Sequence, residues 1–231
     1  MARHRRTQPE VLERGDIYFF YRPAVDQDEP KGLLDVQRFF MVLKPDGDEK
    51  VRLLIVGRKR LPDVETHEKF WGFVDRVERS ATNLERELRS LKYGTETRGE
   101  RREPAARPVG EGVYSITLLS GQMHLSYMLE LPKHPAEVQK AFHIVPQASF
   151  ALSVKNPEAS TPPDVGLREQ DKADYPDRLQ AEFRDRRFER EDVRMLDYPG
   201  AEFILVGASA NPSRPSYFAM KYLLAKGYTV H

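Results

Sequence analysis

The residues of this chain best suited to hold a ligand lie near its end, in a loop of small polar residues. Gly207 allows a tight backbone turn, and Ser209, Ser213 and Ser216 keep the backbone accessible. If a helix begins in this loop, its first N–H groups and its dipole attract phosphate, and Arg214 adds a charged contact. The residue types and spacing therefore predict a phosphate-binding loop.

The elements that must position this loop are a strand before it and a helix after it. Phe203 to Val206 form a continuous apolar run, which is typical of a parallel strand buried on both faces. A helix with an apolar stripe follows and ends at Gly227, and Tyr228 to Val230 begin a second strand. The stripe consists of Met220, Leu223 and Leu224. This order predicts a partial Rossmann-like β-α-β unit over residues 201–231.

A family resemblance supports this prediction. The strings VGAS, NP, RPS, KYLL and GYTV over residues 204–231 resemble the opening unit of the CoA-binding domain family, a Rossmann-like module related to the α subunit of succinyl-CoA synthetase. The resemblance implies that CoA is the ligand. It also implies that the phosphate-binding loop contains Gly207, Ser209, Ser213, Arg214 and Ser216.

The resemblance leaves several alternatives open. Family members continue with an Asn-Pro segment and further β-α units, whereas this sequence stops at His231. Truncation of a longer protein, a junction of unrelated pieces and a native tail each explain this, and we favour the first two. In a purely structural alternative, which we favour slightly for the chain as given, Ile204 to Val206 add one more strand to the main sheet and the following helix covers it.

Residues 1–200 predict a separate domain dominated by strands. Seven short runs rich in Val, Ile, Leu, Tyr or Phe are bounded by Gly, Pro or Asp. They are residues 17–21, 38–43, 51–56, 70–77, 113–119, 123–131 and 149–154. Turn residues at 44–48 and 120–121 predict two hairpins. In the second hairpin, alternation predicts that Met123, Leu125 and Tyr127 face the core and that His124 and Ser126 face water.

A few helices interrupt these strands. Residues 82–85 resemble a capping box, an apolar stripe follows, and Gly94 is the expected stop. Residues 135–142 and 176–186 each open on a Pro and carry a small apolar stripe. We therefore predict an α+β fold with a mainly antiparallel sheet. Residues 94–112 and 155–172 have the composition of long loops.

Strings between residues 9 and 200 resemble a group of bacterial proteins without an assigned activity. Examples are GDIYFFYRP, DVQRFFMVLKP, HEKFWGFVDRV and SFALSVKNP. This resemblance implies a coherent domain of a bacterial protein and no particular function.

Composition excludes several classes of site. The 37 basic residues nearly balance the 36 acidic ones, so no global field marks a nucleic-acid or membrane binder. The chain has no Cys, which excludes disulfides, thiol nucleophiles and Cys-liganded zinc. It lacks both a long apolar run and a secretory signal pattern, so we expect a soluble cytoplasmic protein without a membrane partner.

No enzyme chemistry can be located from the sequence. The six His residues are scattered without a metal-ligand spacing, so no metal is expected. The chain also lacks Walker, Gly-x-Ser-x-Gly and Gly-x-Gly-x-x-Gly motifs. Enzymatic activity stays open, and no catalytic residue is assigned.

Basic and aromatic residues provide the alternative to CoA. Arg58, Lys59 and Arg60 follow a predicted strand, and an Arg-rich loop and several aromatic residues could complete a groove for single-stranded nucleic acid. The loop residues are Arg98, Arg101, Arg102 and Arg107; the aromatic ones are Tyr18, Phe20, Tyr21, Phe39, Phe40, Trp71 and Phe73. We favour a non-enzymatic binder of CoA or a related phosphate-bearing ligand, with a nucleic-acid-binding module as the alternative.

Overall fold

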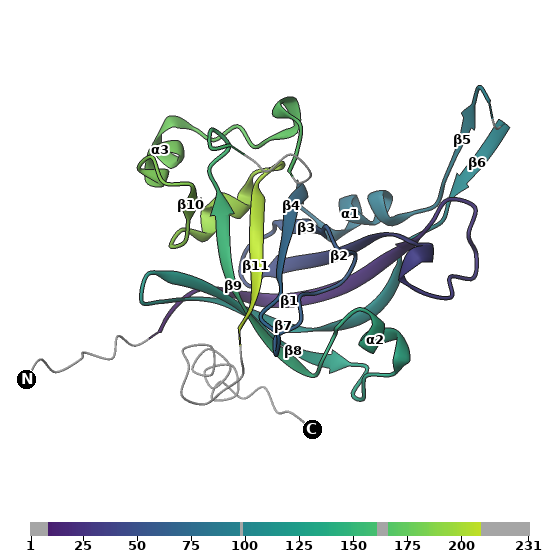
Figure 1. The fold of residues 1–231 in the computed structure, drawn as a ribbon, viewed down its shortest axis with the longest axis horizontal. Coiled ribbons are helices and arrows are strands. Elements are labelled where there is room, and N and C mark those ends of the chain that lie inside the picture. Colours follow the sequence, from purple (N-terminus) through teal and green to yellow (C-terminus); the bar gives the residue numbers. More distant parts are fainter. Residues whose placement is uncertain (1–8, 98, 161–165, 209–231) are drawn as a thin grey trace, which may run out of the picture.

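The computed structural model describes residues 9–97, 99–160 and 166–208, and these residues form a barrel of antiparallel strands (Figure 1). Eight strands make up the wall. They are β1 (Glu10–Pro23), β2 (Val36–Pro45), β3 (Val51–Val56), β4 (Lys69–Glu78), β7 (Arg107–Leu119), β8 (Gln122–Leu131), β9 (Gln147–Lys155) and β11 (Glu202–Ala208).

Pairings between segments that are distant in sequence close the wall. The strand order is β9-β11-β4-β3-β2-β1-β7-β8, and β8 pairs again with β9. Every one of these pairings is antiparallel. Closure leaves no free edge in the wall, which protects the strands from pairing with other chains.

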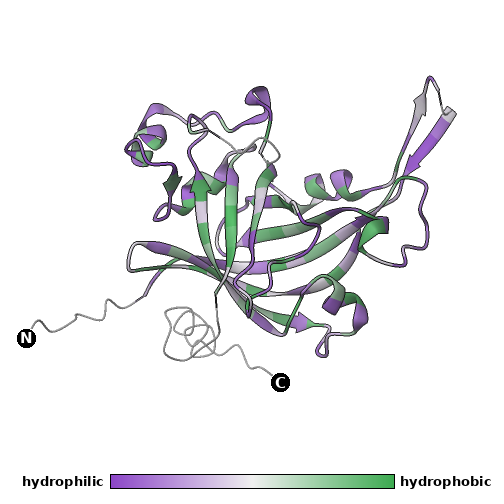
Figure 2. Cartoon of the chain, in the orientation of Figure 1, coloured by the Kyte–Doolittle hydropathy of each residue, from purple (hydrophilic) through white to green (hydrophobic). Residues whose placement is uncertain are grey.

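Alternation along the strands fills the inside of the barrel with apolar side chains. Phe19 and Phe39 stack with their ring centroids 6.1 Å apart, and Tyr127 packs edge-on against Phe19 at 5.1 Å. Hydrophobic residues lie mainly in the wall strands (Figure 2). Hydrophilic residues lie mainly in the connections and in a separate hairpin, β5–β6, over residues 91–103 (Figure 2). All seven predicted strands and both predicted hairpins are confirmed.

A cluster of charged side chains surrounds the buried Arg52. This side chain is fully buried, and its guanidinium donates to Asp197 and Glu13, with Nε 2.8 Å from Asp197 Oδ1 and Nη2 2.8 Å from Glu13 Oε2. Tyr114 donates its hydroxyl to Glu13 at 2.7 Å. Burial opposes the positive charge, but these carboxylates outweigh it and raise the pKa of Arg52.

The predicted fold class needs correction at the C-terminal end. We predicted an α+β fold ending in a Rossmann-like β-α-β unit whose first strand is parallel to its neighbours. Instead, β11 is antiparallel to both β4 and β9 and belongs to the barrel wall. The predicted helix and second strand lie outside the described residues. The antiparallel sheet and the small share of helix were predicted correctly, whereas the Rossmann-like unit was not.

The sequence suggested a parallel strand because β11 is buried on both of its faces. Phe203 and Leu205 face the barrel interior, while Ile204 faces outward and is still only 4% exposed. An antiparallel strand covered on both sides shows the same continuous apolar run as a buried parallel strand. The structural alternative, one more strand in the main sheet, is therefore confirmed for Ile204 to Val206.

Three short helices pack outside the wall, and each overlaps a predicted helix. They are α1 (Ala81–Leu88), α2 (Glu137–Ala141) and α3 (Asp177–Gln180). The N-cap of α1 is Ser80, whose hydroxyl accepts from the Asn83 amide, and the helix ends at Leu88, so the predicted cap and the predicted stop at Gly94 were wrong. Leu84 of α1 packs on an outer apolar cluster with Phe40 and Leu53.

The two predicted loops differ from each other. Residues 94–112 are mostly strand, because β5 (Leu91–Thr95) and β6 (Gly99–Glu103) form a separate hairpin and β7 begins at Arg107. The second region contains only the short 3-10 helix η2 (Glu169–Asp171) among its described residues. Short elements follow it: α3, η3 (Ala181–Phe183), β10 (Phe188–Glu189) and η4 (Val193–Asp197).

The outward face of β8 also differs from expectation. Met123, Leu125 and Tyr127 face the core as predicted, but His124 and Ser126 are buried rather than exposed to water. Ser126 donates its hydroxyl to Ser149 Oγ at 2.9 Å, so small polar groups satisfy one another across the strands. Alternation gave the correct inner face but not the burial of the outer one.

Candidate functional site

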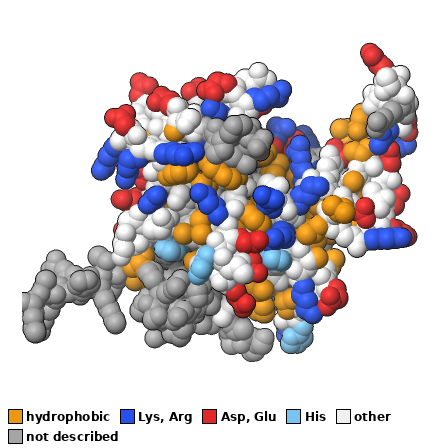
Figure 3. All heavy atoms as spheres, in the orientation of Figure 1, with side chains coloured by type: hydrophobic (Ala, Val, Ile, Leu, Met, Phe, Trp, Pro, Cys, Tyr) orange, Lys and Arg blue, Asp and Glu red, His pale blue; other side chains and the backbone are white. Residues whose placement is uncertain are grey.

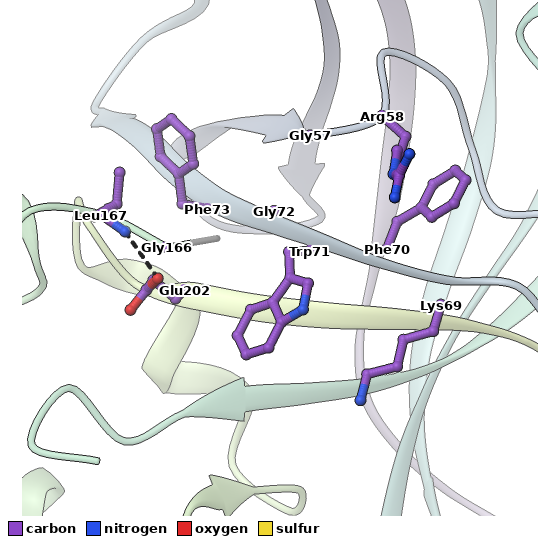
Figure 4. Close-up of a pocket in the computed structure, with 10 residues that line it drawn as sticks. All are labelled: Gly57, Arg58, Lys69, Phe70, Trp71, Gly72, Phe73, Gly166, Leu167 and Glu202. Carbon is purple, nitrogen blue, oxygen red and sulfur yellow. Dashed lines mark hydrogen bonds between the residues drawn. The ribbon is translucent and has the colours of Figure 1, made fainter. Parts of the chain in front are cut away.

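A cavity of about 540 Å³ lies against the outer face of β4 (Figure 4). Because side chains alternate along a strand, Phe70 and Val74 belong to the core while Trp71 and Phe73 point outward. Three further segments complete the cavity: the turn after β3, the backbone at Gly166 and Leu167, and Glu202 of β11. A volume of this size suits a small organic ligand.

Aromatic rings form one side of this cavity. Trp71 is partly exposed, and its ring lies 6.1 Å from Phe188 of β10 at a tilt of 47°. Arg187 lies over the outer part of the same cluster, 5.6 Å from the centre of the Phe188 ring. Phe188 thus packs against Trp71 across the two intervening strands β9 and β11, while part of the Trp71 ring stays accessible to a planar ligand.

Two cations line the cavity. Lys69 precedes Trp71 by two residues and therefore lies on the same face of β4. Arg58 follows Gly57, whose amide donates to the Trp71 carbonyl at 2.9 Å, and its side chain lies beside Phe70, across β4 from Trp71 and Lys69 (Figure 4). Within the described part of the chain, neither the Lys69 nor the Arg58 side chain has an ion-pair or hydrogen-bond partner. Both remain available to an anionic ligand.

Glu202 provides the carboxylate in the cavity wall, but its charge is already compensated. Lys155 lies 3.3 Å away, and both residues are buried. The second carboxylate oxygen accepts from the Leu167 amide at 3.0 Å. A buried carboxylate with both oxygens engaged is a structural group, and it gives no evidence for acid or base chemistry here.

Of the residues predicted to bind CoA, only Gly207 is within the described residues. Its amide donates to the Glu68 carbonyl at 2.9 Å, and its carbonyl oxygen lies 2.8 Å from His67 Nδ1. A Cβ at this position would lie 2.3 Å from the Asp63 carbonyl oxygen, so only glycine fits under the segment 63–68. The other predicted ligands, Ser209, Ser213, Arg214 and Ser216, lie outside the described residues.

The basic groups proposed for nucleic acid are mostly engaged within the protein. Arg60 pairs with Glu68, with 2.6 Å between Nη1 and Oε2, and Lys59 donates to the Val36 carbonyl. The described arginines of the predicted loop also have partners. Arg101 pairs with Asp26, Arg102 with Asp28, and Arg107 donates to the Asp28 carbonyl. Arg98 lies outside the described residues, and the nucleic-acid alternative gains no support from this surface.

The histidines occupy unrelated positions. Among the described residues, no three His, Asp or Glu side chains gather in a way that could hold a metal ion. His124 is buried on β8 with its Nδ1 unpartnered, and burial lowers its pKa. His143 contacts Arg60 at 2.9 Å, and burial and this guanidinium lower its pKa as well. In the same part of the chain, no helix is long and apolar enough to cross a membrane.

Comparison with known proteins links the end of the chain to one ligand. The family model of a CoA binding domain matches residues 201–231. The match begins one residue before β11, so its first residues form the last strand of the barrel wall. No curated protein and no solved structure matches the chain. The similarity therefore concerns this segment of the 231 residues.

Sequence reasoning found part of the cavity but not its shape. Trp71, Phe73 and Arg58 were among the basic and aromatic candidates because of their residue types. Their alternation with Phe70 and Val74 was the signal that could have placed Trp71 and Phe73 on the outer face. Lys69 was missed because it lies at the strand start, and Glu202 was missed because its approach to Phe73 depends on the pairing of β11 with β4.

Proposed function

We propose that this protein is a non-enzymatic binder of CoA or a related phosphate-bearing ligand. The observation that supports this proposal most is the match of residues 201–231 to the CoA binding domain model. The resemblance assigns the phosphate-binding loop to Gly207, Ser209, Ser213, Arg214 and Ser216. Because the Gly207 amide already donates to Glu68, we assign the phosphate contacts to the four residues that follow it.

The chemistry of these residues suits a polyphosphate. Successive backbone amides and serine hydroxyls donate hydrogen bonds to phosphate oxygens, and Arg214 supplies a bidentate cation. In sequence, this loop follows directly after β11, whose Val206 is opposite Lys69 in the strand register. We assign no reaction to the site, because the proposal requires binding alone.

Calorimetric titration with CoA tests this proposal. We expect saturable heat from the intact chain and a loss of about tenfold or more in affinity for Arg214→Ala, because a charge-assisted contact is removed. Arg178→Ala is the matched control, since Arg178 is an exposed arginine remote from the loop in sequence. A flat trace with the intact chain, or equal affinities for the two variants, would contradict the proposal.

A further inference from the structure

The cavity on β4 combines a partly exposed aromatic ring with a cation that has no partner among the described residues. Cations elsewhere usually have a carboxylate partner, as Arg60, Arg101 and Arg102 do. Aromatic side chains elsewhere usually pack within a cluster, as Phe39 does. Around Trp71, in contrast, a partly exposed ring lies on the same side of β4 as Lys69, for which the described residues provide no partner (Figure 4).

This combination matches the two halves of a nucleotide. A purine or pyrimidine presents a flat face that stacks on an indole ring, and its phosphates carry the negative charge that Lys and Arg neutralise. The one carboxylate in the wall, Glu202, is compensated by Lys155 at 3.3 Å, so it does not oppose an anion. On the face formed by β4, β9 and β11, Lys and Arg side chains lie beside hydrophobic ones, with Asp, Glu and His side chains further along the same face (Figure 3).

The register of β4 and β11 gives the cavity a direction. Glu202 lies opposite Phe73 at one end, and Val206 lies opposite Lys69 at the other. The aromatic end is therefore toward Phe73, and the cationic end is toward the point where β11 leaves the barrel. A ligand with its base on Trp71 would direct its phosphates toward Lys69.

We propose that this cavity is a nucleotide site in which the base stacks on Trp71 and a phosphate pairs with Lys69. The proposal rests on the proposed function only for the identity of the nucleotide, which would be the adenine nucleotide part of CoA. The binding of a base and phosphate by the barrel itself depends on the described residues alone. The two proposals can therefore fail separately.

Tryptophan fluorescence gives a direct readout, because Trp71 is the only tryptophan in the chain. The intact protein is titrated with ADP, CoA and pantetheine, which lacks the nucleotide. We expect ADP and CoA to change the Trp71 emission in a saturable way and pantetheine to leave it unchanged. Stacking on the indole is the physical cause of the change.

Two matched variants test the phosphate contact. Lys69→Gln should weaken ADP binding by about tenfold, because a charge-assisted contact is lost. Lys133→Gln removes an exposed lysine from the β8–α2 connection and should leave ADP binding unchanged. Circular dichroism of both variants confirms that each is folded before titration.

The outcomes separate the two proposals. The nucleotide site is overturned if ADP produces no saturable emission change, or if Lys69→Gln and Lys133→Gln bind ADP equally. Calorimetric CoA binding that depends on Arg214, without a change in Trp71 emission, overturns the nucleotide site and supports the proposed function. Saturable ADP binding that depends on Lys69, together with no effect of Arg214→Ala on CoA binding, supports the site and contradicts the proposed function.

Discussion

Strand β3 has a cation near each end, and the two are used in opposite ways. Arg52, near its start, is fully buried with its guanidinium bound by Glu13 and Asp197. Arg58, just after its end, is exposed in the wall of the cavity on β4 and has no partner in the described residues. The first cation is bound to the carboxylates that hold the barrel together, whereas the second is free for a ligand. The difference shows that the partners of a charge, more than its place on a strand, indicate its role.

The strongest way to test this comparison is to remove the buried cation. Arg52→Ala leaves Glu13 and Asp197 without their partner and should lower the free energy of unfolding by about 3–5 kcal/mol. Lys92→Ala is the control, because Lys92 pairs with Glu100 on an exposed hairpin and should cost about 0–1 kcal/mol. Urea unfolding measures both, and equal losses would remove the distinction between structural and free cations.

A smaller effect is expected where β11 passes under segment 63–68. Gly207→Ala places a Cβ 2.3 Å from the Asp63 carbonyl oxygen and should lower the free energy of unfolding by about 1–3 kcal/mol. Gly94→Ala is the matched control, because nothing lies within 4 Å of its added Cβ. Thermal unfolding compares the two variants. A Gly207→Ala protein as stable as the parent would contradict the prediction, because segment 63–68 would then move to make room for the added Cβ.

The pair Arg60–Glu68 should make a pH-dependent contribution. The hydrogen bond from Arg60 lowers the pKa of Glu68 to about 2, below its ordinary value of 4.5. A depressed carboxyl pKa contributes stability that is fully present above about pH 4.5 and is lost as the pH falls toward about 2. Glu68→Gln should therefore remove part of the loss of stability between pH 4.5 and pH 2.

Unfolding by urea at several pH values within this window measures the effect. The control is Glu85→Gln, because Glu85 lies 3.9 Å from Arg89 and is largely exposed. If both variants keep the pH dependence of the parent, the Arg60–Glu68 pair is not its source.

The smallest effect is expected at the free cations. Lys69→Gln removes no contact with a described residue, so the free energy of unfolding should change by no more than about 0.5 kcal/mol. Urea unfolding of this variant beside Arg52→Ala completes the comparison. A loss above 1 kcal/mol would mean that Lys69 has a structural role, and its assignment to a ligand would then lose its basis.

The elements were predictable from local patterns, but their closure was not. Alternation and turn residues located seven strands and two hairpins, because side-chain period and turn conformation depend on neighbouring residues. The pairing of β8 with β9 and of β11 with β4 depends on packing between distant segments. Nothing near Val206 indicates that it lies opposite Lys69, so a barrel was not predicted.

The site was predictable to a similar degree. Residue type alone identified Trp71 and Arg58 as candidates, because aromatic and basic residues are visible in sequence. Their shared cavity requires Leu167 and Glu202, which come from later segments. The engagement of Arg101 and Arg102 by Asp26 and Asp28 was equally hidden, since these pairs join β6 to the distant connection after β1. Sequence patterns therefore indicated which groups exist, and the fold decided which ones are free.

The position of β11 has a consequence for biosynthesis. The ribosome makes β4 and β9 well before the strand that fills the gap between them, so both strands have an unpaired edge on the nascent chain. The wall is sealed only after residue 208 has emerged. Until then, the growing polypeptide exposes two β edges that molecular chaperones could shield, and the segment matched to CoA binding is translated at the moment when the barrel can close.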